Sequence, residues 1–221
     1  MSWTDRIAVE NILKLKREFG LRLAIETGTF RGINAELYSL IFDQVISCEK
    51  NEDFYHQAQI RLAKAKNVTL VNMPSALFLK SVHPYDEFFV YLDAHFYDPH
   101  LKQKWVVIDE LESLKKCTNI VLCIHDFDNG MGHLIYDGES LDWKLLEPYL
   151  KGINPDFHYY TNTECDPFTE TNIKYLPITV DDAVLDAIKF VHSTPQREQR
   201  GMLFCTPRMI DVTKYKLREL C

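Results

Sequence analysis

Short apolar runs alternate with longer amphipathic segments along this 221-residue chain, and this alternation constrains its fold more than any other feature. The short runs are rich in Leu, Ile, Val and Phe and are typical of buried strands, whereas the segments between them place apolar residues at helical spacing. Strands separated by helices favour a mainly parallel sheet with helices on both faces. Seven strands are predicted, at 21–26, 44–48, 68–71, 88–92, 119–124, 157–160 and 202–205.

Helices are expected before and between these strands. In the first of them Ile7, Ile12 and Leu15 share one helical face, and Gly20 favours its end. The run at 119–124 is almost wholly apolar, which predicts a central strand buried on both faces. The predicted helices cover 3–19, 33–42, 52–65, 75–82, 106–116, 141–150 and 181–191.

The length and composition favour one globular α/β domain spanning 1–221. Hydrophobic residues make up 46% of the chain and charged residues 26%, which is typical of a protein that folds around its own core. The sequence contains no internal repeat and no linker rich in Pro, Gly or Ser. A single domain of this class therefore accounts for the whole chain.

Charge and cysteine content limit the expected partners. A formal net charge of -7 gives no general attraction to nucleic acid or to anionic membranes. No apolar run approaches the roughly 20 residues that span a bilayer, and the N-terminus lacks a basic segment followed by an apolar stretch. The six cysteines are scattered without CxxC pairs and are read as reduced thiols. We therefore expect a cytoplasmic protein without nucleic-acid or membrane partners.

Polar or ionisable residues follow the predicted strands at the points where ligands bind in parallel sheets, beyond the carboxyl ends of the strands. Such residues occur at five consecutive strand ends, so chance explains only one or two of them. The strand ends read Glu26-Thr27-Gly28, Glu49-Lys50, Asn72-Met73-Pro74-Ser75, Asp93-Ala94-His95 and His125-Asp126.

The turn after the first strand has the spacing Gly-x-x-x-Gly, with Gly28 and Gly32 at its ends. These glycines let the backbone approach a ligand, and the turn is expected to expose free N–H groups at the start of the following helix. A dinucleotide-binding turn requires Gly-x-Gly-x-x-Gly, and here Phe30 occupies the place of its second glycine. A pyrophosphate is therefore expected to fit poorly.

The segment Glu26-Thr27-Gly28-Thr29-Phe30-Arg31-Gly32 resembles the first motif of the class I S-adenosylmethionine (SAM)-dependent methyltransferases, written E/D-x-G-x-G-x-G. The resemblance extends over 21–127 and departs from the motif at Phe30. It implies a Rossmann-like, doubly wound, mainly parallel seven-stranded sheet with an antiparallel final strand. It also implies a division into an N-terminal helix (1–20), a cofactor-binding core (21–127) and acceptor-side elements with the terminal strands (128–221).

The same resemblance implies a role for each strand end. SAM would lie against the turn, with Glu49 accepting hydrogen bonds from its ribose hydroxyls. Met73 and Ser75 would lie near the adenine, and Asp93 would face the methyl group. The turn residues implicated in cofactor binding are Glu26, Thr27, Gly28, Thr29 and Gly32.

Asp93, His95, His125 and Asp126 come from two strand ends that are neighbours in this fold. Together they offer oxygen and nitrogen ligands for Mg2+ or another divalent cation, with Asp93, His95 and Asp126 as the predicted ligands. Such a cation could orient an acceptor hydroxyl and lower its pKa. Without a metal, His95 or His125 could act as the general base, and His95 is equally well explained as a structural histidine.

The sequence therefore predicts a SAM-dependent O-methyltransferase that acts on a small molecule or glycan, with Asp93, His125 and His95 as candidate catalytic residues. Two alternatives remain open. One is a metal-dependent hydrolase or lyase built on Asp93, His95, His125 and Asp126, with a purely structural Gly turn. The other is a non-catalytic SAM- or nucleotide-binding module. A homo-oligomer is compatible with the sequence, and no motif identifies the acceptor.

Overall fold

The computed structural model describes residues 6–82, 87–94, 105–130, 135–136, 139–164 and 201–220. Its main sheet has eight strands, and a separate two-stranded ribbon comprises β6 (Ile135–Tyr136) and β7 (Glu139–Ser140). The strands of the main sheet are β1 (Leu23–Thr27), β2 (Gln44–Cys48), β3 (Val68–Val71), β4 (Phe88–Leu92), β5 (Val121–His125), β8 (His158–Asn162), β9 (Met202–Thr206) and β10 (Leu217–Glu219).

The strand order β10-β8-β9-β5-β4-β1-β2-β3 places β1 beside both β2 and β4. These pairings are parallel, with Leu23 aligned to Gln44 on one side and to Phe88 on the other. The chain builds outward from β1 to β3 and then returns to β4 on the opposite side of β1. The strand order therefore reverses between β1 and β4, which is where open parallel sheets bind ligands.

The last strands confirm one prediction and correct another. Strand β9 runs antiparallel to β5, as expected for the predicted final strand at 202–205. The sheet has eight strands rather than seven, because β10 adds to its edge by pairing antiparallel with β8. Only Leu217 of β10 is buried, whereas Arg218 and Glu219 are exposed. Such a short, charged edge strand lacks the apolar run by which the other strands were predicted.

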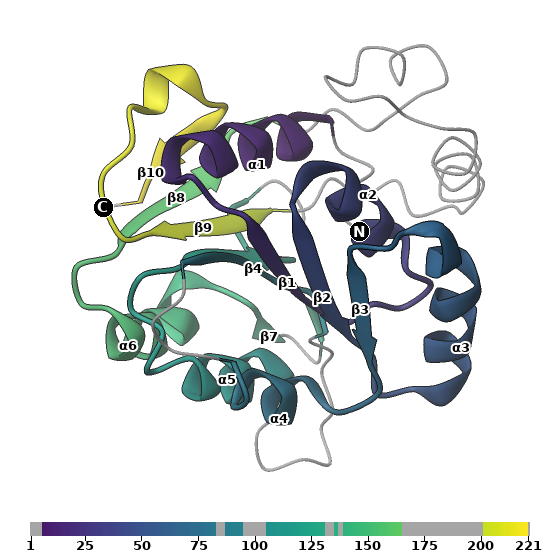
Figure 1. The fold of residues 1–221 in the computed structure, drawn as a ribbon. Helices are drawn as coiled ribbons and strands as arrows, with labels where there is room; N and C mark the ends of the chain where they lie inside the picture. The colour runs from purple at the N-terminus through teal and green to yellow at the C-terminus, as the bar shows by residue number, and fades with distance from the viewer. Residues whose placement is uncertain are drawn as a thin grey trace.

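Helices cover both faces of the sheet (Figure 1). Side chains from α1, α2 and α3 pack into one apolar core, and those from α4, α5 and α6 pack into a second core on the other face. The predicted helix at 181–191 lies outside the described residues. The helices are α1 (Arg6–Phe19), α2 (Ile33–Ile41), α3 (Glu52–Arg61), α4 (Ser75–Leu79), α5 (Val106–Ser113) and α6 (Trp143–Ile153).

The central strands explain why their sequences are uninterrupted by polar residues. Every residue of β4 and of β5 is buried, because both faces of these strands lie beneath helices. Side-chain caps begin two of the helices: Asn51 accepts a hydrogen bond from the Phe54 N–H at α3, and Asp142 accepts one from the Leu145 N–H at α6. These caps determine where the chain turns from strand end to helix.

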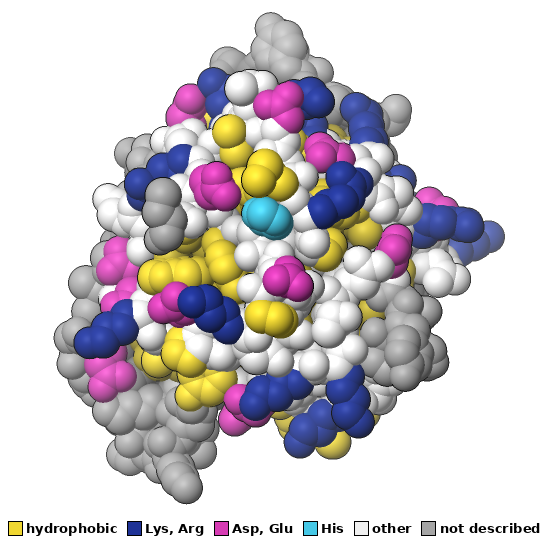
Figure 2. All heavy atoms as spheres, turned by 90° about the vertical axis from the view of Figure 1, so that its left-hand side faces the viewer, with side chains coloured by type: hydrophobic (Ala, Val, Ile, Leu, Met, Phe, Trp, Pro, Cys, Tyr) yellow, Lys and Arg dark blue, Asp and Glu magenta, His cyan; other side chains and the backbone are white. Residues whose placement is uncertain are grey.

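The surface carries mixed charge on the side that includes α6 and the C-terminal strands. Lys and Arg side chains alternate there with Asp and Glu, and small hydrophobic areas lie between them (Figure 2). None of the described helices combines the length and the apolar character that crossing a bilayer requires.

Candidate functional site

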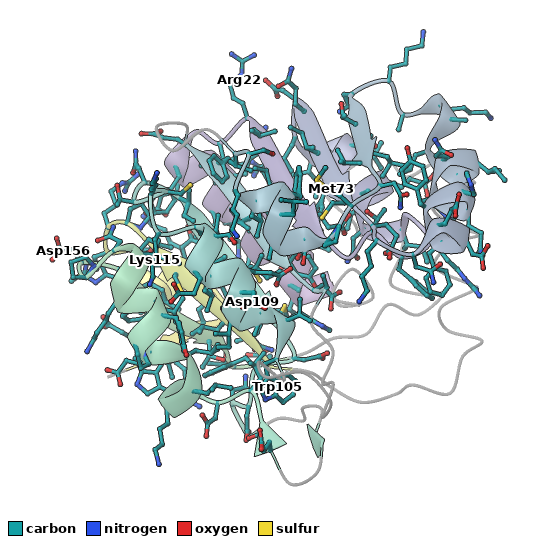
Figure 3. The ribbon with its side chains drawn as sticks, turned by 90° about the horizontal axis from the view of Figure 1, so that it is seen from below. Arg22, Met73, Trp105, Asp109, Lys115 and Asp156 are labelled. Atoms are coloured by element: carbon teal, nitrogen blue, oxygen red, sulfur yellow. The ribbon has the colours of Figure 1, made fainter. Side chains whose placement is uncertain are left out.

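A cavity of about 630 Å³ lies at the carboxyl ends of the parallel strands, where the strand order reverses. Its volume falls in the range typical of small-molecule sites. Met73, which follows β3, and Asp109, on α5, both line the cavity; both are labelled in Figure 3. The predicted site residues that line the cavity are Gly28, Thr29, Glu49, Met73, Ser75, Asp93 and Asp126.

Gly28 allows the turn after β1 to lie directly against the end of β4. Its φ angle is +77°, and a Cβ atom at this position would lie 2.7 Å from the Ala94 Cα. Any other residue would therefore push the turn away from Asp93 and Ala94. The glycine is required for close approach of two protein segments, as well as for the left-handed backbone.

Four N–H groups within the turn itself, ahead of the donors predicted at the start of the following helix, already have partners. Gly28 and Thr29 both donate to the Cys48 carbonyl, at 3.0 and 3.1 Å. The Gly32 N–H donates to the Thr29 carbonyl at 2.8 Å, and the Phe30 N–H donates to Glu49 Oε2 at 2.8 Å. The turn folds onto the end of β2, so these donors are already occupied.

The Glu49 side chain, directly after β2, hydrogen-bonds to the turn and also lines the cavity. Its Oε2 accepts from the Phe30 N–H and its Oε1 accepts from the Asn51 N–H, both at 2.8 Å. Its own carbonyl accepts from Asn72 Nδ2 at 2.8 Å, which holds its backbone. A carboxylate oxygen has two acceptor positions, so each oxygen of Glu49 retains one for a ligand.

Glu26 and Thr27 are fully buried beneath the turn, and neither lines the cavity. Glu26 Oε2 accepts a hydrogen bond from the Ser47 hydroxyl at 2.5 Å, and Ser47 is linked in turn to Thr29. Among the described residues Glu26 Oε1 has no hydrogen-bond partner. Burial raises the pKa of Glu26 to about 8, so this carboxyl group is largely neutral at pH 7. Its position supports the turn from behind.

Glu110 is a second buried carboxyl group, which sequence reasoning missed. It is fully buried on α5, and burial raises its pKa to about 7, although the nearby Ser75 and Thr27 hydroxyls lower it. A signal was present in the sequence: Glu110 shares a helical face with Val107 and Leu114, where an apolar residue is expected.

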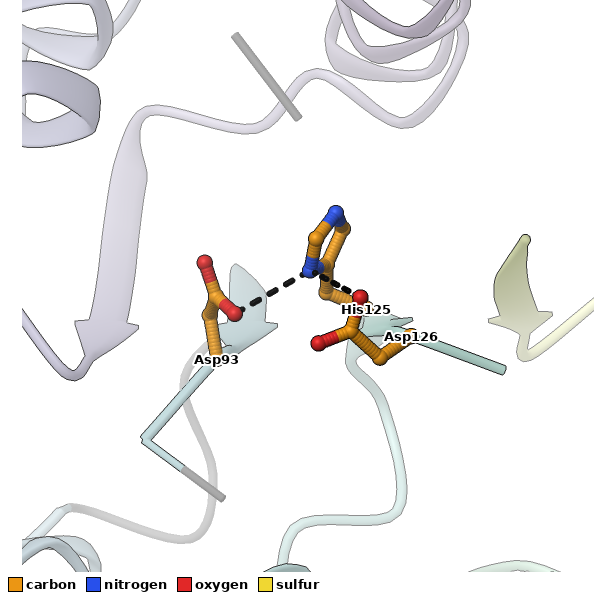
Figure 4. Close-up of side chains that lie close together, drawn as sticks. All are labelled: Asp93, His125 and Asp126. Carbon is orange, nitrogen blue, oxygen red and sulfur yellow. Dashed lines mark hydrogen bonds and ion pairs between the residues drawn. The ribbon is translucent and has the colours of Figure 1, made fainter. Parts of the chain in front are cut away.

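Asp93, His125 and Asp126 form a compact cluster at the ends of β4 and β5 (Figure 4). His125 Nδ1 lies 3.1 Å from Asp93 Oδ1 and 3.2 Å from Asp126 Oδ1. His125 is only 2% exposed and does not line the cavity, whereas both carboxylates do. The structure thus places the imidazole behind two carboxylates that face the ligand space.

The charges in this cluster stabilise one another. Burial is the largest single effect and raises the pKa of Asp93, but the charge of His125 and its hydrogen bond help to hold the pKa below its usual value. Burial lowers the pKa of His125, yet the carboxylates of Asp126 and Asp93 raise it overall. Asp93 is therefore ionised beside a histidine that favours its protonated form.

The predicted metal ligands are only partly described, because His95 lies outside the described residues. Asp93, His125 and Asp126 present ligand atoms within 4.8 Å of one another, a set that a divalent cation accepts. In the arrangement seen, one ring nitrogen faces both carboxylates at hydrogen-bonding distance, which suits a shared N–H. A cation would need that nitrogen unprotonated, so the metal stays a prediction.

Sequence comparison identifies no relative: no protein-family model matches the chain, and no curated protein matches it. Similarity is found among solved structures. A SAM-dependent methyltransferase from Archaeoglobus fulgidus matches with a TM-score of 0.50 at 16% identity, over 90% of this chain and 93% of that one. The plantazolicin methyltransferase BamL, solved with S-adenosylhomocysteine (SAH), matches with a TM-score of 0.50 at 12% identity, over 90% and 82% of the two chains.

A spermidine synthase, solved with the transition-state analogue AdoDATO, also matches, with a TM-score of 0.51 at 13% identity. That match covers 88% of this chain and 57% of the synthase. Identities this low show a shared fold and not a shared activity. The three structures illustrate this, since two are named methyltransferases and the third a spermidine synthase. The chain therefore has the Rossmann-like fold of the class I SAM-dependent methyltransferases.

Proposed function

We propose that this protein is a SAM-dependent methyltransferase that methylates a hydroxyl group of a small molecule or a glycan. One observation carries the proposal: Glu49, the Gly28 turn and the Asp93 and Asp126 carboxylates line a single cavity. A ligand in this cavity would bridge a hydroxyl-binding carboxylate and a proton-accepting cluster. The SAH complex of a protein with the same fold supports the choice of ligand.

The residues around the cavity fit the parts of SAM. The free acceptor positions of Glu49 suit two ribose hydroxyls. Gly28 and Thr29 provide a close backbone surface for the methionine portion, and Met73 and Ser75 provide one for the adenine. Glu26, Thr27 and Gly32 act indirectly in this proposal, because they hold the turn in place from outside the cavity.

The chemistry assigned to the protein is positioning and proton removal. When bound against Glu49 and the Gly28 turn, SAM would supply an electrophilic methyl group with a sulfur leaving group. Asp93 accepts the proton that the acceptor oxygen loses, and even a weakly basic carboxylate suffices because an alkylated hydroxyl is strongly acidic. His125 positions Asp93 from behind. Most of the rate enhancement comes from holding the oxygen in line with the methyl group.

A second candidate is a metal-dependent hydrolase or lyase, favoured by the ligand spacing of Asp93, His125 and Asp126. It predicts turnover without SAM and complete dependence on a divalent cation. A non-catalytic binding module, in contrast, would bind SAM and show no methyl transfer to any acceptor. These outcomes separate the candidates in a single set of assays.

Calorimetric titration of the purified protein with SAM, SAH and NAD, with and without Mg2+, tests the proposal. We expect micromolar binding of SAM and SAH and none of NAD, with Glu49→Gln weakening SAH binding at least tenfold. Glutamine supplies one acceptor oxygen in place of two. Glu52→Gln is the matched control, because Glu52 is an exposed carboxylate on the first turn of α3.

Glu49→Gln also removes one backbone contact of the turn, so thermal unfolding of both variants must accompany the titrations. Binding of neither SAM nor SAH by the wild type would overturn the methyltransferase proposal. If binding occurs, methyl-labelled SAM with a panel of hydroxyl-bearing acceptors, in chelator and in Mg2+, tests turnover and the role of a metal.

A further inference from the structure

Two described residues other than glycine have a positive φ angle, Phe30 at 52° and Asp126 at 60°. Both line the same cavity. A Cβ atom makes this left-handed conformation unfavourable, whereas glycine adopts it freely. Such strain persists only where the surrounding structure enforces it, and it concentrates at ligand sites. Because both strained residues line one cavity, their side chains are better explained by contact with a ligand than by the stability of the backbone.

Several contacts hold Phe30 in its unfavourable conformation. Its N–H donates to Glu49 Oε2 at 2.8 Å. Its ring centroid lies 4.4 Å from that of Phe54, on α3, and 5.2 Å from the Arg31 guanidinium. The turn therefore presents an aromatic ring at the position where the resembling motif has its second glycine.

The Phe30 ring is not part of the protein core. Phe30 and Phe54 are both half-buried, and neither belongs to the two apolar cores formed by the described residues. Both rings instead line the cavity, alongside Glu49 and Asn51. Packing of the fold does not account for this aromatic pair, whereas contact with a ligand does.

We propose that Phe30 is a specificity-determining residue whose ring packs on the ribosyl part of an adenosyl ligand, with Phe54 supporting the ring. This inference rests on the proposed function, which places a ribose at Glu49. The Glu49 carboxylate accepts a hydrogen bond from the Phe30 N–H and is also the group proposed to bind the ribose hydroxyls. The Phe30 ring and the Glu49 carboxylate would therefore contact the same sugar. Glu49 would bind the hydroxyl groups of the ribose, and the aromatic ring of Phe30 would pack on its apolar C–H face.

The same ring discriminates between ligands. In a dinucleotide-binding turn the second glycine lets a pyrophosphate approach the backbone. Here Phe30 occupies the place of that glycine, and its side chain lines the cavity. The pocket therefore favours an adenosyl compound without a phosphate chain on its ribose, which describes SAM and SAH and excludes NAD.

Titration of the full-length protein with SAH and with adenosine tests this role. Phe30→Leu keeps the Cβ atom but removes the aromatic ring, and we expect it to weaken binding of both ligands about fivefold. Phe30→Tyr restores an aromatic ring and should retain wild-type affinity. Phe19→Leu is the matched control, since Phe19 lies at the end of α1 and not in this cavity. Thermal unfolding verifies that each variant is folded.

The outcomes separate this inference from the proposed function. Binding of neither SAH nor adenosine by the wild type contradicts both. Wild-type binding with unchanged affinity in Phe30→Leu overturns the inference alone, as does an equal loss in Phe30→Leu and Phe30→Tyr. A loss seen with SAH but not with adenosine places the ring against the amino-acid portion and overturns its assignment to the ribose.

Discussion

Two groups of buried carboxyl side chains lie near the same edge of the sheet, and they differ in charge. Glu26 and Glu110 are fully buried, and burial raises their pKa values to about 8 and about 7. Asp93 is held below its usual pKa because His125 lies 3.1 Å away. Burial alone therefore does not decide ionisation at this site; a cationic neighbour does.

This difference separates two roles in the proposed enzyme. Glu26 and Glu110 lie outside the cavity lining, and burial favours their neutral forms. The ionised cluster of Asp93, His125 and Asp126 presents carboxylates where a proton must be removed. Substitutions that remove the cation, or that neutralise a glutamate permanently, test the comparison directly.

Removal of the cation is expected to have the largest effect. His125→Ala leaves the buried Asp126 and the partly buried Asp93 carboxylates without the imidazole, and we expect the free energy of unfolding at pH 7 to fall by about 3–5 kcal/mol. In the wild type, the stability contributed by Asp93 is lost as pH falls below its unfolded pKa toward its lower folded pKa. That contributed by His125 is lost as pH rises through its raised folded pKa.

Denaturant unfolding between about pH 3 and pH 9 measures this effect, because His125→Ala should lose both contributions. His158→Ala is the control, since His158 is a partly exposed histidine 4.0 Å from Glu219. Equal, small losses of stability in the two variants would contradict a stabilising charge cluster at His125. His125 would then not explain why the pKa of Asp93 is lowered while the pKa values of Glu26 and Glu110 are raised.

Replacement of Glu26 by a permanently neutral residue should raise the free energy of unfolding, whereas removal of His125 should lower it. The folded pKa of Glu26, about 8, lies above its unfolded value, so the stability it contributes is present at low pH and is lost as pH rises toward 8. We expect Glu26→Gln to be more stable than the wild type by about 2 kcal/mol near pH 8.5 and nearly equal to it near pH 5.

Unfolding curves at these two pH values check the prediction. Glu147→Gln on α6 serves as the control, because Glu147 forms a surface ion pair with Lys151 at 2.8 Å. A Glu26→Gln variant that is destabilised equally at both pH values would show that Glu26 is ionised in the folded protein.

Glu110→Gln should give the smallest effect, with the same sign as Glu26→Gln. The Ser75 and Thr27 hydroxyls partly stabilise the ionised carboxylate, so its folded pKa reaches only about 7. We expect a gain of about 1 kcal/mol at alkaline pH. A pH series distinguishes the two glutamates: the gain should level off near pH 7 for Glu110 and near pH 8 for Glu26. A gain independent of pH would contradict this assignment.

Local sequence patterns predicted much of the architecture. The predicted strands at 44–48, 68–71 and 88–92 match β2, β3 and β4, because each is a short apolar run that ends at a polar residue. Once these strands lie parallel, their carboxyl ends meet at one edge. The placement of Glu49, Ser75 and Asp93 around one cavity therefore follows from the topology.

Other features depended on contacts that no local pattern reveals. Strand β10 pairs with β8 although its own sequence is mostly charged. The N–H groups of the turn are occupied because β2 and Glu49 lie against it. His125 is the last residue of β5 and faces Asp93 rather than the cavity, a direction that register and burial impose.

By itself, then, the amino-acid sequence determined most of the strands and helices, the glycine turn and the carboxylates at the strand ends, since hydrophobic periodicity and glycine spacing act over short distances. Only the tertiary structure decided which carboxyl groups are neutral, which are ionised, and which backbone donors remain for a ligand. Those properties depend on burial and on neighbours far apart in the chain: Glu26 beside Ser47, Phe30 beside Glu49, and Asp93 beside His125.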